Sequence, residues 1–324
     1  MAFTKDVLKI DPERVSSRLA AFIRDAVTNR YKRKGIVIGL SGGLDSAVSA
    51  ALSVKALGQD KVIGILLPEM DSSPVSREYG LKLADSLGIE CHEVNITHML
   101  EAFGVYERRD AIVRKLFPDV RPPYKFRLVL PQDLLDRERL NLYYMEMLLP
   151  DGSMRKERLA HHDYMQLMAA NDIKQRLRMT QLYYEAERRY YIVGGTTNYP
   201  EMIQGFFVKY GDGGVDIEPL TYLYKRQVYD LARHLNVPRE ILERTPSPDT
   251  YSLPVSDQDF YFCMPYEILD YIIYASEHDV DHGEVARTLG LTPEQVARAV
   301  REIVRKREAT NVLRELPLNP GNKL

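Results

Sequence analysis

The sequence predicts an α/β fold, in which a parallel, doubly wound sheet is flanked by helices. Short apolar runs rich in β-branched residues alternate with helical patterns over the N-terminal third of the chain, and this alternation is typical of parallel strands connected by helices. A glycine-rich turn, residues 41–46, joins the first of these runs directly to a helix. The chain has 324 residues, enough for one large domain or two ordinary ones.

Three strands and three helices are predicted before the alternation lapses. Asp11 can cap the first helix, Pro12 fits its first turn, and apolar residues then recur at helical spacing. The apolar run at residues 35–40 is short and continuous, which is typical of a strand buried on both faces. The elements that follow are a helix ending near Leu57, strands at 62–67 and 89–96, and a helix at 77–87 between them.

The alternation lapses from about residue 106 to 162, where the chain is charged, rich in Arg and Tyr, and interrupted by prolines. Apolar residues at 128–130 and 143–149 are predicted to form a hairpin-like pair, because a Pro-Asp-Gly turn signal at 150–152 closes the second run. We therefore predict an inserted lobe over these residues.

After the lobe the helical and strand patterns return. A long helix is predicted over residues 163–188, a strand over 190–194 and a helix over 222–235, and closing helices follow a Pro-rich loop at 245–257. The last eight residues contain two prolines and a glycine, which is typical of a loose tail. The predicted organisation is one domain over residues 1–316, with the inserted lobe at about 106–162, and a tail over 317–324.

Composition excludes several classes of protein. The 44 Lys and Arg residues balance 46 Asp and Glu residues, for a formal net charge of −2, whereas binding nucleic acid through bulk positive charge needs a basic surplus. Two cysteines, Cys91 and Cys263, are too few for a disulfide scaffold and favour a reducing compartment. No window approaches ~18 uninterrupted apolar residues, and the start lacks a secretion signal. We expect a soluble cytoplasmic protein that binds neither a membrane nor a nucleic acid.

The turn Ser-Gly-Gly-Leu-Asp-Ser, from Ser41 to Ser46, is the strongest functional signal. A strand that opens through such a turn into a helix points several backbone N–H groups at one place, which makes an anion site. Gly42 and Gly43 let the backbone approach a ligand, and both serine hydroxyls can donate to phosphate oxygens. Asp45 would repel a phosphate unless a divalent cation lay between them. A plain helix cap is the other interpretation.

Five stretches together resemble one enzyme family. The turn at 41–46 is similar to the pyrophosphate loop of the N-type ATP pyrophosphatases, which adenylate an oxygen atom and release pyrophosphate. Four further stretches, in family order, resemble the ammonia-dependent NAD synthetases. They are residues 171–179 for N-I-K-A-R-x-R-M, 195–201 for G-T-x-N-x-x-E, 206–216 for F-x-K-Y-G-D-G-G-x-D, and 219–228 for P-L-x-x-L-x-K-x-Q-V.

The resemblance implies an adenine nucleotide alpha hydrolase-like fold with a helical C-terminal part, and it assigns site residues. Asp45 and Glu201 match the positions that bind Mg²⁺, while Asp45 and Lys225 match catalytic positions. The residues that match ATP-binding positions are Ser41, Gly42, Gly43, Leu44, Asp45, Ser46, Thr196, Lys225 and Ser247.

The resemblance also implies the reaction and its partners. The nicotinate carboxylate of deamido-NAD attacks the α-phosphate of ATP, pyrophosphate leaves, and ammonia displaces AMP from the acyl-adenylate to give NAD. Arg176, Lys209 and Asp216 match positions that bind deamido-NAD, and Arg176 fits its diphosphate because a guanidinium pairs bidentately with phosphate oxygens. The family is homodimeric, so a homodimer is expected. Free ammonia or a separate glutaminase subunit would supply the nitrogen.

The segment after Ser247 departs from the family pattern. The family follows P-[S/T]-A-D with an acidic D-E-x-E-L-G stretch, whereas residues 256–263 read Ser-Asp-Gln-Asp-Phe-Tyr-Phe-Cys, with Gln and aromatics in place of two acids. The lobe is also longer than the family norm, and the basic residues that close over the substrate fall near Lys306 and Arg307. A paralogue that amidates or adenylates another carboxylate is therefore one alternative, and a non-catalytic nucleotide-binding protein is a second.

Overall fold

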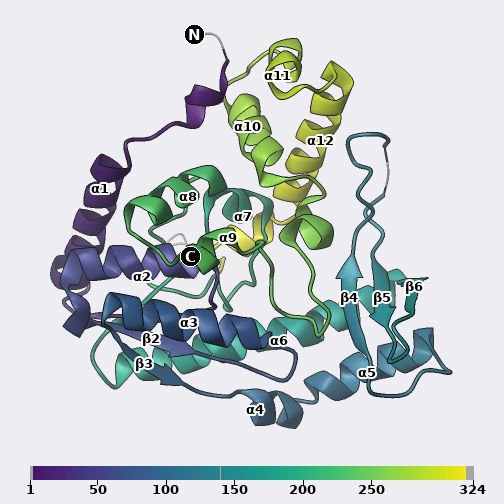
Figure 1. Ribbon diagram of the computed structural model, residues 1–324, viewed down its shortest axis with the longest axis horizontal. Helices are drawn as coiled ribbons and strands as arrows, with labels where there is room; N and C mark the ends of the chain where they lie inside the picture. Colours follow the sequence, from purple (N-terminus) through teal and green to yellow (C-terminus); the bar gives the residue numbers. More distant parts are fainter. Residues whose placement is uncertain (1–2, 139, 319–324) are drawn as a thin grey trace, which may run out of the picture.

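The computed structural model describes residues 3–138 and 140–318. Its main sheet has four parallel strands in the order β3-β2-β1-β7 (Figure 1). The parallel sheet is therefore confirmed, although β3 and β7 are shorter than the runs expected at 89–96 and 190–194. The strands are β1 (Ile36–Gly39), β2 (Val62–Leu66), β3 (Glu90–Glu93) and β7 (Ile192–Gly194).

Helices cover both faces of this sheet, as expected for a doubly wound fold (Figure 1). Those that contribute to the core on one face are α1 (Pro12–Asp25), α2 (Leu44–Leu57), α3 (Pro74–Leu87) and α8 (Lys225–His234). Those that contribute to the core on the other face are α4 (Thr97–Ala102), α5 (Val105–Leu116) and α6 (His161–Glu187).

Strand β1 explains why two cores form. Its side chains Ile36 and Ile38 belong to the core with α1, α2 and α8, whereas Val37 belongs to the core with α5 and α6. All three are fully buried. Because successive side chains of a strand point to opposite faces of a sheet, an apolar run without alternation is buried on both sides.

The lobe contains a second sheet, which is antiparallel with the order β4-β5-β6. Strands β4 and β5 lie where the sequence indicates a hairpin, and β6 is an additional strand whose charged, mostly exposed residues carry no strand pattern. Figure 1 shows this sheet above α5. The strands are β4 (Lys125–Val129), β5 (Tyr144–Leu148) and β6 (Met154–Arg158).

Helix α5 differs from the sequence-based prediction, which has no helix in this part of the lobe. Its buried residues are Val105, Tyr106, Ile112 and Val113. They are separated by a run of charged residues, so the apolar stripe is too narrow to stand out as a helical pattern. The prediction was wrong here because a helix needs only a short buried face when tertiary packing stabilises it.

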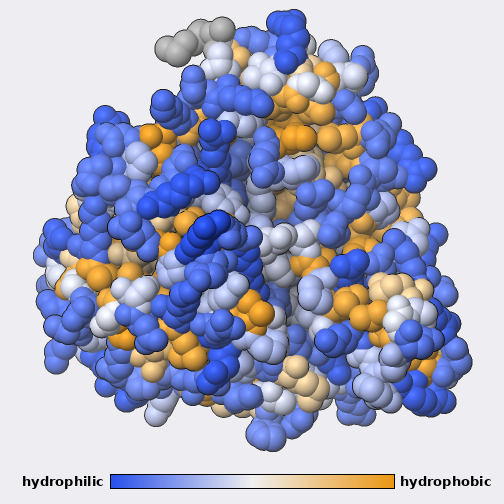
Figure 2. Space-filling view, viewed as in Figure 1, coloured by the Kyte–Doolittle hydropathy of each residue, from blue (hydrophilic) through white to orange (hydrophobic). Residues whose placement is uncertain are grey.

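The C-terminal part is helical and shares a core with the lobe. Phe126 of β4 and Met145 of β5 lie in the same buried cluster as Ile273 and Ile303 of the C-terminal helices. Hydrophobic side chains also gather on the surface over α10 to α12, on an otherwise mostly hydrophilic face (Figure 2). The remaining helices are α7 (Tyr199–Gln204), α9 (Arg239–Glu243), α10 (Tyr266–Glu277), α11 (His282–Leu289), α12 (Pro293–Ala309) and α13 (Asn311–Arg314).

Short 3₁₀ and π-helical segments complete the secondary structure, at Lys5–Leu8, Ala26–Arg30, Gln59–Lys61 and Gln258–Phe262. Within the described residues, no helix has the length and apolar character needed to cross a membrane. Of the predicted tail, residues 319–324 lie outside the described residues, and the division into domain and tail stays a prediction.

Candidate active site

The loop from Ser41 to Ser46 connects β1 to α2 at the carboxyl end of the sheet. Gly42 has a φ of +69°, and a Cβ on it would lie 2.3 Å from the carbonyl oxygen of Ser76 in α3. Glycine alone meets both demands. The Gly43 N–H donates to the Ser41 hydroxyl at 3.2 Å, and the Ser46 hydroxyl donates to the Gly43 carbonyl at 3.0 Å. These contacts fix the turn at the N-terminus of α2.

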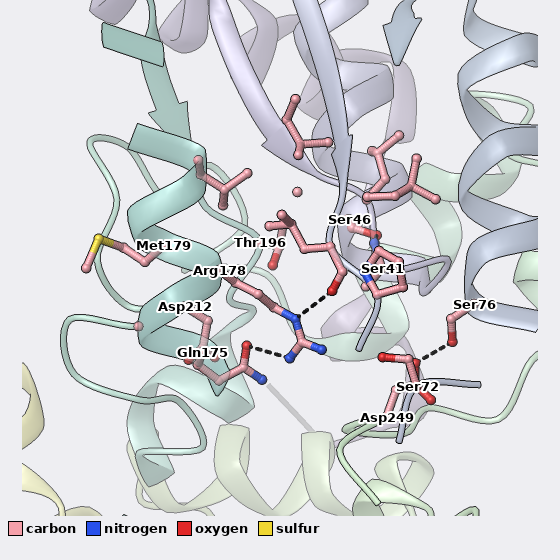
Figure 3. A pocket seen from close by; sticks show the side chains of 18 of the residues that line it. Ser41, Ser46, Ser72, Ser76, Gln175, Arg178, Met179, Thr196, Asp212 and Asp249 are labelled. Atoms are coloured by element: carbon pink, nitrogen blue, oxygen red, sulfur yellow. Dashed lines mark hydrogen bonds between the residues drawn. The ribbon is translucent and has the colours of Figure 1, made fainter. Parts of the chain in front are cut away.

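A first cavity, of about 240 Å³, opens at the carboxyl ends of β1, β2 and β7 (Figure 3). Arg178 of α6 points across it and donates to the carbonyl of Leu67 at 3.2 Å and to Gln175 Oε1 at 3.3 Å. Its wall combines serine hydroxyls with apolar side chains of the sheet. Open α/β sheets bind ligands at this edge, at the point where the order of the strands reverses. Here that point is beside β1, because β2 and β3 lie on one side of it and β7 lies on the other.

A second cavity, of about 270 Å³, adjoins the first, and Ser41, Ser46 and Thr196 line both. The structure therefore brings together most of the residues that the sequence assigns to ATP and metal. Those lining one or both cavities are Ser41, Gly43, Leu44, Asp45, Ser46, Thr196, Glu201, Lys225 and Ser247. Gly42 lies in the same loop but lines neither cavity.

Two carboxylates and one ammonium form a cluster in the second cavity. Lys225, the first residue of α8, is 2% exposed, and its Nζ donates to Asp45 and lies 3.7 Å from Glu201 Oε1. Asn198 donates to Asp45 Oδ1 at 3.1 Å. Asn198 also caps α7, since its side chain accepts from the Glu201 N–H and its own N–H donates to the Glu201 carboxylate. The capping box thereby orients one carboxylate while contacting the other.

Lys225 alone does not balance the charge of its neighbours. Burial, followed by the charge of Asp45, raises the pKa of Glu201 well above its ordinary value, despite Lys225. Burial likewise raises the pKa of Asp257 to about 6. Burial acts to lower the pKa of Lys225, but the charges of Asp45, Glu201 and Asp257 outweigh it and raise that pKa. With all three carboxylates ionised, the cluster would have an excess of negative charge, which a bound cation would neutralise.

Asp45 and Glu201 have the chemistry of an Mg²⁺ site. Mg²⁺ prefers oxygen ligands and is commonly held by one or two carboxylates together with substrate phosphates and water. Within residues 3–138 and 140–318, no three His, Cys, Asp or Glu side chains are arranged to hold a metal ion by themselves. Two carboxylates beside a phosphate-type loop therefore fit a metal whose other ligands come from a nucleotide.

Sequence reasoning missed Arg244, which follows α9. Its guanidinium donates to the Gly42 carbonyl at 3.1 Å and to the Ser76 hydroxyl at 2.7 Å. Ser76 in turn donates to Asp249 at 2.5 Å. Arg244 and Asp249 both line the second cavity. The Pro-Ser-Pro-Asp segment, residues 246–249, is therefore attached to the glycine loop. The only sequence signal was a basic residue two positions before that segment.

Part of the segment that departs from the family pattern also lines the second cavity. Asp257, Phe260 and Tyr261 are on its wall, together with Tyr143 from the lobe. Lys306 of α12 donates to the Tyr261 carbonyl, so one of the two C-terminal basic residues named from the sequence contacts this wall through the backbone.

The three residues predicted to bind deamido-NAD lie outside both cavities. The Arg176 side chain is 45% exposed and lies 3.9 Å from Asp172. Lys209 Nζ donates to two backbone carbonyls near the C-terminus, at 2.7 and 2.8 Å. The Asp216 carboxylate accepts from the Val193 N–H at 2.8 Å and from the Tyr183 hydroxyl at 3.3 Å. Their assignment to deamido-NAD stays a prediction.

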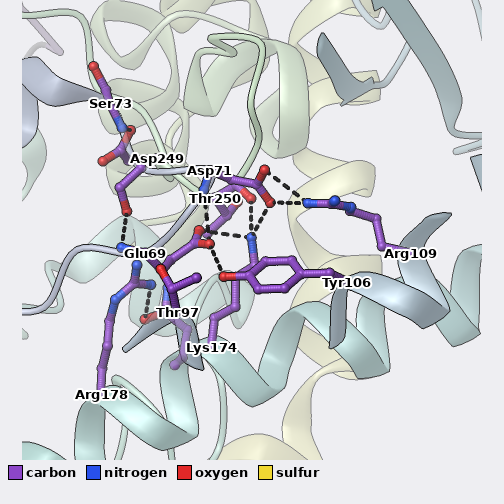
Figure 4. A network of polar contacts seen from close by, with 12 residues as sticks. Glu69, Asp71, Ser73, Thr97, Tyr106, Arg109, Lys174, Arg178, Asp249 and Thr250 are labelled. Carbon is purple, nitrogen blue, oxygen red and sulfur yellow. Dashed lines mark hydrogen bonds and ion pairs between the residues drawn. The ribbon is translucent and has the colours of Figure 1, made fainter. Parts of the chain in front are cut away.

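A buried ion network joins the lobe to the turn that precedes α3 (Figure 4). Lys174 Nζ of α6 lies 2.9 Å from Glu69 and 2.8 Å from Asp71. From α5, the Tyr106 hydroxyl donates to Glu69 at 2.8 Å, and Arg109 pairs with Asp71 at 2.7 Å. Since Ser72 and Ser73 of the same turn line the first cavity, the network links the lobe to the cavity wall.

A family model described as NAD synthase matches residues 15–117 and 138–313. The chain belongs to the NAD synthase family. This confirms the family predicted from the five motifs. The match skips residues 118–137, which contain β4, so this part of the lobe is an addition to the NAD synthase pattern.

Curated relatives are similar over nearly the whole chain. The "NH(3)-dependent NAD(+) synthetase" of Mesorhizobium japonicum is 40% identical over 312 residues, which is 96% of this chain and 98% of that protein. The protein of the same name from Thermotoga maritima is 39% identical over 264 residues, 81% of this chain and 87% of that protein. These matches confirm the prediction of an enzyme of the NAD synthase family.

Solved structures confirm the predicted fold. A structure described as NMN synthetase from Francisella tularensis has a TM-score of 0.66 and 26% identity, covering 97% of this chain and 100% of that one. An NH3-dependent NAD synthetase from Campylobacter jejuni has a TM-score of 0.62 and 21% identity, covering 96% of this chain and 99% of that one. The second likeness concerns the fold alone.

Proposed function

We propose that this chain is an ammonia-dependent NAD⁺ synthetase, which converts deamido-NAD, ammonia and ATP to NAD, AMP and pyrophosphate. The observation that carries the proposal is the meeting of the 41–46 loop with Asp45, Lys225 and Glu201 in one continuous cavity. A glycine loop at a helix N-terminus offers contacts to phosphate, and paired carboxylates offer contacts to a metal. Membership of the NAD synthase family and the names of the relatives support the same reaction.

In this proposal the nucleoside of ATP occupies the first cavity, and its phosphates lie along the glycine loop. The N-terminus of α2, into which the loop leads, favours phosphate oxygens. Thr196, at the junction of the two cavities, lies beside the α-phosphate. Lys225 and Arg244 add positive charge around the triphosphate, and Lys225 keeps its charge at neutral pH because its neighbours raise its pKa.

We propose that Asp45 and Glu201 hold Mg²⁺ against the phosphates. The metal would neutralise charge on the phosphate oxygens and on the departing pyrophosphate. Asn198 fixes the direction of both carboxylates through its side chain and its backbone N–H. The raised pKa of Glu201 agrees with a carboxylate that lacks a sufficient counter-charge in the protein itself.

The proposed chemistry needs no enzyme nucleophile. A carboxylate oxygen of the nicotinate group forms a bond to the α-phosphorus, and the bond from that phosphorus to the bridging oxygen breaks, so that pyrophosphate leaves with the electron pair. Ammonia then forms a bond to the acyl carbon and loses a proton, while the bond from that carbon to the AMP oxygen breaks. The protein contributes positioning and charge neutralisation.

We place the acceptor so that its carboxylate enters the second cavity and the rest of deamido-NAD extends outward. Arg176, Lys209 and Asp216 are proposed to bind its outer part near the boundary of a homodimer. Free ammonia, or ammonia from a separate glutaminase subunit, is the proposed nitrogen source, and the reaction is placed in the cytoplasm.

Nicotinate mononucleotide is a second candidate acceptor. Two observations favour it: the likeness to a structure described as NMN synthetase, and the position of all three predicted dinucleotide-binding residues outside the cavities. A mononucleotide would need only the contacts that one chain makes around the second cavity.

The test is an assay of AMP release with ATP, Mg²⁺ and ammonium, in which deamido-NAD, nicotinate mononucleotide and other carboxylates are compared. We expect deamido-NAD to have the highest kcat/KM. A higher value for the mononucleotide would favour the second candidate, and activity with other carboxylates alone would favour a paralogue. ATP binding without pyrophosphate release, whatever the acceptor, would instead indicate a non-catalytic nucleotide-binding protein.

A further inference from the structure

One face of helix α6 lines the second cavity. Tyr164, Met168, Asp172 and Gln175 all line it, and their positions in the sequence, four, four and three residues apart, place them on the same side of the helix. Gln175 also lines the first cavity, so this end of the face lies where the two cavities adjoin. From there the face leads along α6 to Tyr164.

Aromatic rings surround the cavity at the Tyr164 end. Tyr143 of the lobe stacks on Tyr164, with 4.4 Å between the ring centroids and 13° between the ring planes. Phe260 packs against both Tyr143 and Phe206, at centroid distances of 5.8 and 6.0 Å, and Phe206 stacks on Tyr261 at 4.8 Å. All five residues line the second cavity, and we call them the aromatic wall. Such a wall suits a planar ring or a cation.

Asp172 supplies a negative charge on this face of α6. Its side chain is 29% exposed and accepts no hydrogen bond from the residues that the structure describes. Its ion-pair partner, Arg176, is 3.9 Å away and lines neither cavity. Burial raises the pKa of Asp172 more than Arg176 lowers it. The carboxylate is therefore accessible and only weakly paired within the chain.

Asp172 and Gln175 are also positions at which this chain departs from the family motif. When Ile173 and Lys174 are aligned with the Ile and Lys of N-I-K-A-R-x-R-M, Asp172 stands in place of Asn and Gln175 in place of Ala. Asp172 is about one helical turn from Gln175. A carboxylate at this position attracts a cationic ligand, whereas a neutral amide does not.

We propose that Asp172 and the aromatic wall select an acceptor whose ring is a cation, namely nicotinate linked through its ring nitrogen to ribose. This inference rests on the proposed function. The ring nitrogen of such a nicotinate has a permanent positive charge and no N–H, so a nearby carboxylate and the faces of aromatic rings recognise it without a hydrogen bond. With the acceptor carboxylate placed where the two cavities adjoin, the ring lies along the α6 face at Asp172.

The test compares oxidised with reduced deamido-NAD. Both forms have the same carboxylate and phosphates, but the dihydropyridine ring of the reduced form is uncharged. With a non-hydrolysable ATP analogue bound, Asp172→Asn should raise the Kd of the oxidised form about three- to tenfold, somewhat more than the loss of an exposed ion pair. The Kd of the reduced form should stay nearly unchanged. The KM of oxidised deamido-NAD for AMP release should rise by the same factor as its Kd.

Two results with Asp172→Asn would overturn the inference. An unchanged Kd of the oxidised form would show that Asp172 does not contact the ring. Equal changes for the two forms would show that Asp172 only orients Arg176 towards the phosphates, which both forms carry.

Glu187→Gln is the matched control. Glu187 is the last residue of α6, is exposed and lines neither cavity, so its substitution removes one negative charge from the same helix. Both Kd values should stay unchanged. A loss of affinity for the oxidised form as large as in Asp172→Asn would contradict the inference, because the net charge of the helix would then be the cause.

A measurement on the unmodified protein covers the case in which Asp172→Asn does not fold. At low ionic strength the oxidised form should bind severalfold more tightly than the reduced form, and the difference should shrink as salt is added, because it depends on an attraction between charges. Equal affinities would contradict the inference. If the unmodified enzyme releases no AMP with any nicotinate acceptor and saturating ammonium, the proposed function itself fails, which distinguishes the two.

Discussion

The nucleotide side and the acceptor side of this protein differ in how completely one chain builds them. Residues assigned to ATP and metal come from several loops at the carboxyl edge of one sheet and line two adjoining cavities. Residues assigned to deamido-NAD lie on outer surfaces or are engaged in internal contacts: Arg176 is half exposed, Lys209 contacts the C-terminal segment, and Asp216 contacts β7.

The difference shows which ligand the fold of a single chain is sufficient to bind. Parallel strands bring their carboxyl ends together whatever the length of the connections, so a nucleotide site there follows from the topology. The outer part of a long acceptor extends beyond that edge. In the proposed function, binding of that outer part would depend on a second subunit, whereas a smaller acceptor would not reach so far.

The largest effect is expected at Asp45, one of the two carboxylates that are proposed to hold Mg²⁺ on the nucleotide side. Asp45→Asn should lower the rate of AMP release by roughly 100- to 1000-fold, as for the loss of one preorganised electrostatic contact to a transition state. The fold should persist, because the Asn amide oxygen can still accept from Lys225, which keeps Glu201 at 3.7 Å as a counter-charge, and the unfolding midpoint checks this. Near-full activity would rule out the assignment of the glycine loop.

A glycine substitution tests the shape of the same loop. Gly42→Ala would place a Cβ 2.3 Å from the Ser76 carbonyl at a positive φ, so we expect a loss of about 1–3 kcal/mol in unfolding free energy and a large rise in the KM for ATP. Gly43→Ala is the control, because its φ is −99° and its nearest contact is the Ser41 side chain at 3.2 Å. Equal effects of the two substitutions would contradict the argument.

Arg244 tests whether the Pro-Ser-Pro-Asp segment belongs to the nucleotide side. Arg244→Gln removes charged hydrogen bonds to Gly42 and Ser76, and the KM for ATP should rise about tenfold or more. Arg239→Gln changes the first residue of α9, the short helix that Arg244 follows; its side chain is 84% exposed, so this substitution should leave the KM for ATP unchanged. If Arg244→Gln changes only the KM of the acceptor, the segment does not belong to the nucleotide side.

The smallest effect is expected on the acceptor side. Arg176→Ala should raise the KM of the acceptor severalfold and leave the KM for ATP unchanged, since an exposed cation contributes about 1 kcal/mol or less to most pairs. Arg188→Ala is the control, because Arg188 follows directly after α6 and its side chain is also 45% exposed. If both variants behave alike with deamido-NAD, Arg176 has no role in binding it, and the mononucleotide becomes the favoured acceptor.

The features that the sequence could predict are mostly those formed by residues close together in the chain. The strand, turn and helix around 41–46 are contiguous, so their geometry follows from apolar pattern and glycine position. Arg244 could not be found in this way, because its role depends on contacts with residues far away in the chain, Gly42 and Ser76. Helix α5 was missed because its apolar stripe is short and it is stabilised by packing into two separate cores.

Lys174 has a consequence for how the molecule unfolds. It is 2% exposed and neutralises Glu69 and Asp71, while Tyr106 and Arg109 reach the same carboxylates from α5. Opening the lobe alone would leave buried charges without their partners. Breaking a buried ion pair by removing one partner typically costs about 3–5 kcal/mol. The lobe and the sheet should therefore unfold in one cooperative transition, and the lobe should resist proteases until the whole chain unfolds.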